Sequence, residues 1–106
     1  MIRSPAIPYH DYIVGKSAVL GLTRTMASEL GAFGIRVNAI APGLTYPTAS
    51  SKYTHRDIRE ALIAQTPTKR LTTPEDVAGS AVFLASELSN NMTGQCLFID
   101  GGLTML

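Results

Sequence analysis

Two short apolar segments that each end at glycine limit the folds open to this chain of 106 residues. Residues 35–41 (IRVNAIA) are followed by Pro42-Gly43, and residues 95–100 (QCLFID) are followed by Gly101-Gly102. Both patterns are typical of strands buried on both faces of a parallel sheet. Helical patterns precede and separate them, in the order helix, strand, helix, helix, strand. This order predicts an α/β fold with a mainly parallel sheet.

The first helix is predicted over residues 10–31, which contain no proline. Its apolar positions recur at spacings of three and four and so predict a buried stripe, formed by Val19, Leu22, Met26 and Leu30. Leu20 lies off this stripe, which predicts a second covered face, with a partner subunit as one candidate for the cover.

Two further helices are predicted in the second half of the chain. A short helix is expected at 57–65, after a polar loop at 44–56. The last helix has a clear start, because Thr73 can cap it, Pro74 suits its first position and Asp76 adds an acidic first turn. Its apolar stripe is predicted to be Val77, Ala81, Leu84, Ala85 and Leu88.

Composition excludes several functional classes. Hydrophobic residues make up 45% and charged residues 16%, as in globular proteins. The net charge is +1 with both signs interleaved, so no nucleic-acid partner is expected. The apolar runs are too short to span a membrane, and the N-terminus lacks the apolar core of a signal peptide. The single cysteine, Cys96, cannot form an internal disulfide, so a cytoplasmic location is expected.

Tyr12 and Lys16 lie four residues apart, which places them one turn apart on the predicted first helix. A free tyrosine has a pKa near 10, and lowering it by about 3 units costs roughly 4 kcal/mol. A neighbouring Lys⁺ favours the phenolate, and a tyrosine tuned in this way can protonate a ketone or deprotonate an alcohol. The spacing by itself favours a chance pair on a helix surface over a catalytic pair. Ligands of open α/β sheets bind beyond the carboxyl ends of strands, where Pro42-Gly43 and the next residues would lie.

Four segments together resemble the short-chain dehydrogenase/reductase family. They are Tyr12-x-x-x-Lys16 with Ser17-Ala18-Val19, then GIRVNAIAPG (34–43), RLTTPEDVAGSAVFLAS (70–86) and MTGQCLFIDGG (92–102). They span essentially the whole chain and are most similar to 3-oxoacyl carrier-protein reductases and to sugar or alcohol dehydrogenases.

The resemblance implies hydride transfer between NAD or NADP and a small-molecule carbonyl or secondary alcohol. Tyr12 would be the general acid/base, and Lys16 would lower its pKa and bind the nicotinamide ribose. The other implied cofactor contacts are Pro42, Gly43, Leu44, Thr45 and Thr48. The family often has a threonine at the position of Pro47, so the resemblance assigns this cofactor contact to Thr48, one position later. The loop 44–56 and the helix 57–65 would form the lid, whose Tyr46, Tyr53 and His55 are either substrate contacts or exposed loop residues.

The Gly-rich phosphate turn of the family, Thr-Gly-x-x-x-Gly-x-Gly, does not occur in this sequence. The catalytic serine of the family would fall just upstream of Met1. The chain is therefore expected to be one partial domain (1–106), the C-terminal part of a Rossmann-like doubly wound parallel sheet without its N-terminal half. Little or no turnover is expected of it alone. Its expected partner is a second copy, as a homo-oligomeric dimer or tetramer, or the missing half. The alternative function is a non-catalytic oligomerisation or interaction remnant.

The remaining polar residues are expected to be structural. Cys96 is interpreted as an inert thiol, and His10 and His55 lack ligand spacing, so no metal site is expected. Asp100 is predicted to cap the turn at Gly101-Gly102. Asn38 is predicted to be a hydrogen-bonded buried residue. The pair Lys69 and Arg70 is predicted to be solvated.

Overall fold

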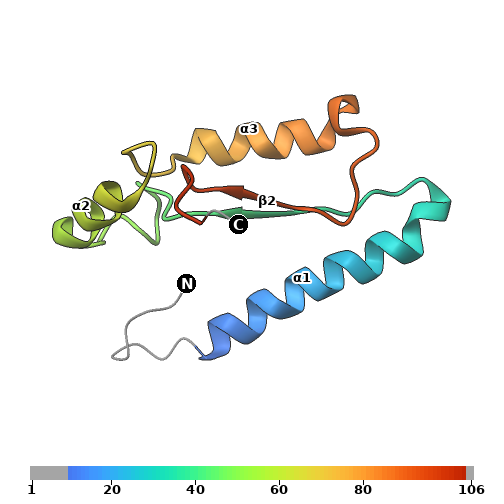
Figure 1. Ribbon diagram of the computed structural model, residues 1–106, viewed down its shortest axis with the longest axis horizontal. Coiled ribbons are helices and arrows are strands. Elements are labelled where there is room, and N and C mark those ends of the chain that lie inside the picture. Colours follow the sequence, from blue (N-terminus) through green and yellow to red (C-terminus); the bar gives the residue numbers. More distant parts are fainter. Residues whose placement is uncertain (1–9, 105–106) are drawn as a thin grey trace. The chain divides into compact units, whose positions relative to one another are not determined.

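The computed structural model describes the backbone of residues 10–104 and the side chains of residues 15–104. Its helices are α1 (His10–Leu30), α2 (Arg56–Gln65) and α3 (Pro74–Ala85), and its strands are β1 (Ala39–Pro42) and β2 (Cys96–Ile99) (Figure 1). Short 3₁₀ turns follow α1 at Gly31–Phe33 and α3 at Glu87–Ser89. The predicted order of elements is confirmed. Among the described residues, one compact unit comprises 10–39 with 93–95, and the other comprises 40–92 with 96–104.

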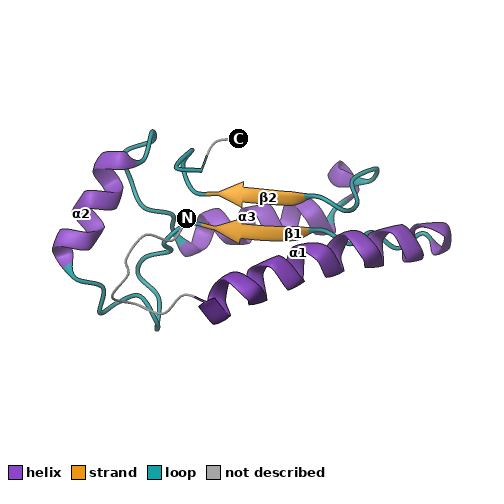
Figure 2. Cartoon of the chain, turned by 60° about the horizontal axis from the view of Figure 1, so that its bottom comes forward, coloured by secondary structure: helices purple, strands orange, loops and turns teal. Residues whose placement is uncertain are grey.

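The two strands form a parallel pair, and their arrows point the same way in Figure 2. The Gly94 amide donates to the Val37 carbonyl at 2.7 Å, the Ala39 amide to the Gln95 carbonyl at 2.8 Å, and the Gly43 amide to the Ile99 carbonyl at 2.9 Å. Residue numbers thus rise together along both strands, as a parallel ladder requires. The predicted α/β class is confirmed.

The strands are shorter than predicted, and β1 begins four residues late. Side chains replace ladder partners at its predicted start: the Val37 amide donates to Thr93 Oγ1 at 3.0 Å, and Asn38 Oδ1 accepts from the Gln95 amide at 3.1 Å. The predicted hydrogen bonding of Asn38 is confirmed, but its predicted burial is wrong, because Asn38 is half-buried. The strand therefore starts only at Ala39 and extends through Pro42.

The prediction that both strands are buried on two faces is wrong for residues 10–104. Most residues of β1 and β2 are half-buried, Pro42 is exposed, and Phe98 is 42% exposed. The reason is the size of the sheet, since each strand has one neighbour among residues 10–104 and α3 packs beside β2 (Figure 1).

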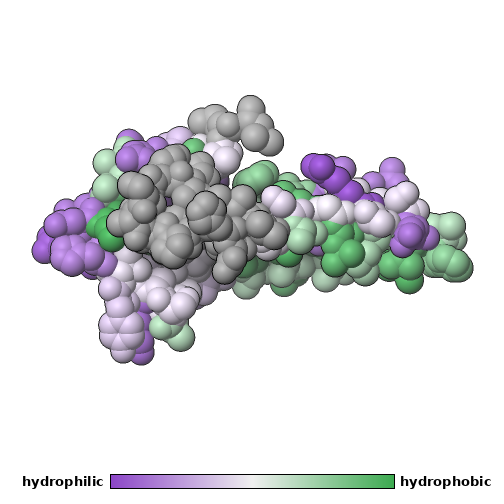
Figure 3. Space-filling view, turned by 90° about the horizontal axis from the view of Figure 1, so that it is seen from below, coloured by the Kyte–Doolittle hydropathy of each residue, from purple (hydrophilic) through white to green (hydrophobic). Residues whose placement is uncertain are grey.

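α1 buries a different face from the predicted one. Thr23 and Ala27 are buried and Leu20 is half-buried, whereas Val19 and Leu22 are 53% and 58% exposed. Ala27 faces Gly94, where an added Cβ would lie 3.5 Å from the Ala27 methyl group. The Thr23 hydroxyl is satisfied within the helix by donating to the Val19 carbonyl at 2.7 Å. Hydrophobic side chains thus remain exposed along α1 (Figure 3).

The start of α3 is confirmed in detail. Thr73 Oγ1 accepts from the Asp76 amide at 3.1 Å, and Asp76 Oδ2 accepts from the Thr73 amide at 2.9 Å, which forms a capping box ahead of Pro74. The predicted apolar stripe is only partly correct, because Val77 and Leu84 are half-buried whereas the others are exposed. No helix within residues 10–104 has both the length and the apolar character to cross a membrane.

Candidate functional site

Tyr12 and Lys16 both belong to α1, which runs without interruption from His10 to Leu30. Their backbone positions are therefore one turn apart, about 6 Å along the axis. Lys16 is exposed, and the side chain of Tyr12 lies outside the described residues, as do those of His10 and Asp11. The predicted acid–base role of the pair stays a prediction.

Residues 43–46, here called the β1 exit segment, leave the carboxyl end of β1. The Gly43 amide donates to the Ile99 carbonyl at 2.9 Å, which extends the strand pairing by one residue. Thr45 then pairs with Thr72 in a parallel bridge, and the Tyr46 amide donates to the Thr72 carbonyl at 2.9 Å. The exit segment is thus held between the end of β2 and the chain before α3.

A side chain at Gly43 would crowd its neighbours. A Cβ added there would lie 3.0 Å from the Asp100 Cβ, 3.2 Å from the Asp100 Cα and 3.4 Å from Thr72 Oγ1. Asp100 is itself fixed, because its carboxylate accepts from the amides of Gly102 at 3.0 Å and Thr104 at 3.1 Å. The predicted turn cap at Asp100 is confirmed, and it leaves little room for movement away from Gly43.

Hydroxyl groups close the loop that follows the exit segment. Ser51 is buried, donates through Oγ to the Thr45 carbonyl at 2.6 Å and accepts from the Thr48 amide at 2.9 Å. Thr48 Oγ1 accepts from the Ser51 amide at 3.0 Å and donates to Ser51 Oγ at 2.8 Å. The Thr48 hydroxyl is therefore engaged inside the loop, whereas the Thr45 hydroxyl donates to the nearby Gly43 carbonyl at 3.1 Å.

α2 begins one residue earlier than predicted, and His55 caps it. Its Nδ1 accepts from the Asp57 amide at 3.1 Å, so one of its ring nitrogens already has a structural partner. The Arg59 guanidinium from the same helix lies 4.5 Å from the ring centre of Tyr46, which is a cation–π contact. This contact joins α2 to the exit segment.

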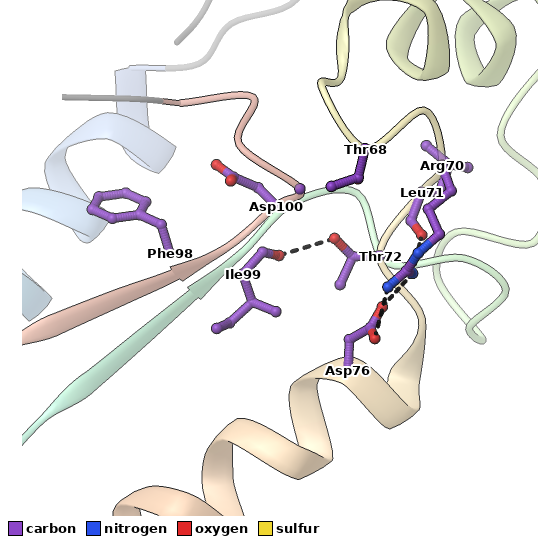
Figure 4. Close-up of a pocket in the computed structure, with 9 residues that line it drawn as sticks. Thr68, Arg70, Leu71, Thr72, Asp76, Phe98, Ile99 and Asp100 are labelled. Atoms are coloured by element: carbon purple, nitrogen blue, oxygen red, sulfur yellow. Dashed lines mark hydrogen bonds and ion pairs between the residues drawn. The ribbon is translucent and has the colours of Figure 1, made fainter. Parts of the chain in front are cut away.

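A cavity of about 270 Å³ lies between the end of β2 and the start of α3 (Figure 4). Arg70 spans its edge and pairs with both Asp76 oxygens, at 2.7 and 3.2 Å. The side-chain hydrogen bond from Arg70, followed by the Thr73 amide, holds the pKa of Asp76 well below its ordinary value of 3.8. A smaller cavity of about 40 Å³ is lined by residues that include Gly43, Leu44, Thr72 and Asp100.

The structure brings four of the implied cofactor contacts into one continuous stretch, which runs from Pro42 to Thr45. Thr48 is tied to the same stretch through Ser51. Tyr12 and Lys16 belong to the other compact unit.

Sequence reasoning missed four residues of the second unit. The capping role of His55 had a local signal, its place just before the helix. The pairing of the exposed Arg70 with Asp76 had only a weak signal in the sequence, because the two opposite charges are six positions apart. Ser51 and Thr72 had no signal, because a buried hydroxyl cannot be told from an exposed one in a polar segment.

Comparison with known proteins gives the family. Residues 4–104 match the family model described as enoyl-(acyl carrier protein) reductase, which covers nearly the whole chain. The chain belongs to the short-chain dehydrogenase/reductase family. The predicted resemblance is thereby confirmed.

Its relatives carry the names of enzymes with different substrates. The chain is 45% identical over 97 residues to an A-factor type gamma-butyrolactone 1'-reductase (1S-forming) of Streptomyces virginiae, covering 90% of this chain and 38% of the relative. It is 42% identical over 98 residues to 3beta-hydroxysteroid dehydrogenase 1 of Eggerthella lenta. This match covers 92% of this chain and 38% of the relative.

Among solved structures, a 3-oxoacyl-[acyl-carrier protein] reductase of Brucella melitensis is 39% identical to the chain, with a TM-score of 0.84. The match covers 90% of this chain and 35% of that one. The chain thus spans less than two fifths of each relative's length.

Proposed function

We propose that the protein is an NAD- or NADP-dependent oxidoreductase, of which this chain supplies the C-terminal part of a Rossmann-like domain. Hydride would pass between the nicotinamide ring and a small-molecule carbonyl or secondary alcohol. The observation that carries the proposal is the placement of Tyr12 and Lys16 one turn apart on the unbroken α1 of a short-chain dehydrogenase/reductase chain.

Tyr12 is the proton donor and acceptor in this proposal. Its phenol protonates the substrate oxygen during reduction and accepts the alcohol proton during oxidation. The Lys16 ammonium group favours the phenolate and so lowers the pKa of Tyr12. A nicotinamide cofactor, when bound, would supply or accept the hydride.

The cofactor is proposed to lie along Pro42, Gly43, Leu44 and Thr45, with Thr48 at the margin. The Thr45 hydroxyl, which donates to the Gly43 carbonyl, retains lone pairs that can accept from an amide. These residues fit the nicotinamide end of a dinucleotide only, because the sequence has no Gly-rich phosphate turn. Phosphate contacts would therefore come from residues outside this sequence, and we propose that the 106-residue chain alone has little or no turnover.

The test uses the protein expressed from the longest reading frame that encodes the chain. We expect NADH or NADPH oxidation in the presence of a panel of ketones, and Tyr12→Phe is expected to lower kcat by about 10²- to 10⁴-fold. Tyr9→Phe removes the same group three residues away and is the matched control. Equal activity in both variants would refute the role of Tyr12. Clear turnover by the isolated chain would refute its proposed inactivity.

The second candidate is a non-catalytic oligomerisation or interaction module. The exposed apolar residues Val19, Leu22 and Met26 of α1 favour it, because such a stripe is more stable when another surface covers it. A homo-oligomer, dimer or tetramer, would cover this stripe with a second copy, and an N-terminal half of the domain on the same reading frame is the other proposed cover. In either case a cytoplasmic location is proposed, without nucleic-acid or membrane partners.

A further inference from the structure

We propose that Thr72 is a positioning residue that holds the β1 exit segment in place for the nicotinamide cofactor. This inference rests on the proposed function. Thr72 lies in the connection between α2 and α3, distant in sequence from both Tyr12 and the Pro42-Gly43 turn.

Thr72 pairs directly with the far end of the exit segment and is linked to its near end through β2. At the far end its carbonyl accepts from the Tyr46 amide at 2.9 Å, next to its parallel bridge with Thr45. At the near end its hydroxyl donates to the Ile99 carbonyl at 2.9 Å, and the same carbonyl accepts from the Gly43 amide at 2.9 Å. The Ile99 carbonyl of β2 thus binds both Gly43, the first residue of the exit segment, and Thr72. Thr72 in turn pairs with Thr45, the third residue of the segment.

The Thr72 hydroxyl is part of a buried residue and donates within the protein. Thr72 is 6% exposed, and a buried hydroxyl is unfavourable unless it is hydrogen-bonded. In Figure 4 its side chain points toward the Ile99 carbonyl, and the dashed line marks their hydrogen bond. Because the Ile99 carbonyl also accepts from the Gly43 amide, we expect the effect of this hydroxyl on a bound cofactor to pass through the exit segment.

The position of Thr72 is itself fixed from the other side. The next residue, Thr73, is locked to Asp76 by the capping box of α3. Thr72 is thus a rigid link between the start of α3 and the exit segment. A loose link would let Gly43 and Thr45 shift, and a shift of about 1 Å in a positioning element reduces activity substantially.

The test compares Thr72→Val, which removes the hydroxyl at nearly constant volume, with Thr72→Ser, which keeps it. Thr93→Val is the matched control, because Thr93 Oγ1 accepts from the Val37 amide at the other end of the strand pair. In the protein from the longest reading frame, Thr72→Val is expected to raise the cofactor KM about three- to tenfold, with the ketone KM unchanged. Thr72→Ser restores the cofactor KM, and Thr93→Val leaves it unchanged.

Amide hydrogen exchange supplies a readout that does not need turnover. We expect the Tyr46 amide to exchange faster in Thr72→Val, whereas Thr93→Val accelerates Val37 and not Tyr46. Unchanged Tyr46 exchange in Thr72→Val, or faster exchange with an unchanged cofactor KM, overturns the inference. If Thr72→Val does not fold, Thr72→Ala takes its place with the same expected outcomes.

Failure of the proposed function is distinguishable from failure of the inference. A wild-type protein without NADH or NADPH turnover refutes the proposed function, and the cofactor role of Thr72 with it, whatever the exchange of Tyr46. If the wild-type protein turns over and Thr72→Val has the same cofactor KM as Thr93→Val, only the inference about Thr72 is refuted.

Discussion

Gly43 lies against Asp100 so closely that a methyl group on Gly43 would approach the Asp100 Cα to 3.2 Å. The two residues directly follow the paired strands β1 and β2, so the carboxyl ends of both strands are packed against each other. Asp100 holds the turn after β2 through two amides and cannot easily retreat. Glycine at position 43 therefore has a packing role in addition to its proposed place beside the cofactor.

Gly43→Ala is expected to lower the free energy of unfolding by about 1–3 kcal/mol, because overpacking forces the backbone of Asp100 to move. Urea unfolding measures the change. Gly79→Ala is the control, since an added Cβ in α3 meets nothing within 4 Å and replaces a poor helix former. That control should stabilise the protein by roughly 0.5–1 kcal/mol. A Gly43→Ala variant as stable as the wild type would show that the two strand ends can separate freely.

Ser51→Ala is expected to loosen the loop after the exit segment. It leaves the Thr45 carbonyl and the Thr48 amide without the partner that Ser51 Oγ provides, at a cost of about 1–3 kcal/mol. Thermal unfolding measures the cost, and amide exchange at Thr48 locates it. Ser50→Ala removes only an exposed contact of 3.3 Å between Ser50 Oγ and Thr48 Oγ1 and keeps both Ser51 hydrogen bonds, so it should change both quantities less. If the Thr48 amide exchanges equally in both variants, the hydrogen-bonded loop does not persist in solution.

Asp76→Asn is expected to reduce stability at neutral pH and to have less effect in acid. The pKa of Asp76 is lower in the folded chain than its ordinary 3.8, so its ionised form stabilises the fold above that value. This contribution disappears as the pH falls through the folded-state pKa. The difference in Tm between wild type and variant should therefore shrink steadily below about pH 4.

Arg70→Gln tests the cause of the lowered pKa of Asp76. The side-chain hydrogen bond from Arg70 is the largest single cause, ahead of the Thr73 amide, so this variant should lose part of the same pH dependence and keep the part due to Thr73. A Tm difference for Asp76→Asn that stays constant from neutral pH down to about pH 3 would contradict the assignment.

Local sequence signals were sufficient for the elements whose causes are local. The capping box at Thr73 and Asp76 lies within four consecutive residues, and α3 begins where these residues predict. The parallel pairing followed from two apolar segments joined by helical residues. These features depend on neighbours in sequence, which the sequence displays directly.

Features that depend on distant contacts could not be predicted from the sequence. The covered face of α1 was misassigned because apolar spacing cannot tell which side faces the chain, and small Thr23 and Ala27 are buried while larger Leu22 is exposed. The role of Thr72 depends on Ile99, 27 positions away. A hydroxyl in a Ser/Thr-rich stretch gives no indication of such a partner.

Leu22→Glu is expected to weaken self-association of the protein. Val19, Leu22 and Met26 form an exposed apolar stripe on α1, and a charge at its centre cannot be buried without a partner. Size-exclusion chromatography with light scattering should show an oligomer for the wild type and a dissociation constant raised about tenfold or more for the variant. Ser28→Glu places the same charge at an exposed position on the side of the helix away from the stripe and should leave the oligomer intact. A monodisperse wild-type monomer would instead indicate that the stripe is covered within one chain, and it would count against the oligomerisation module.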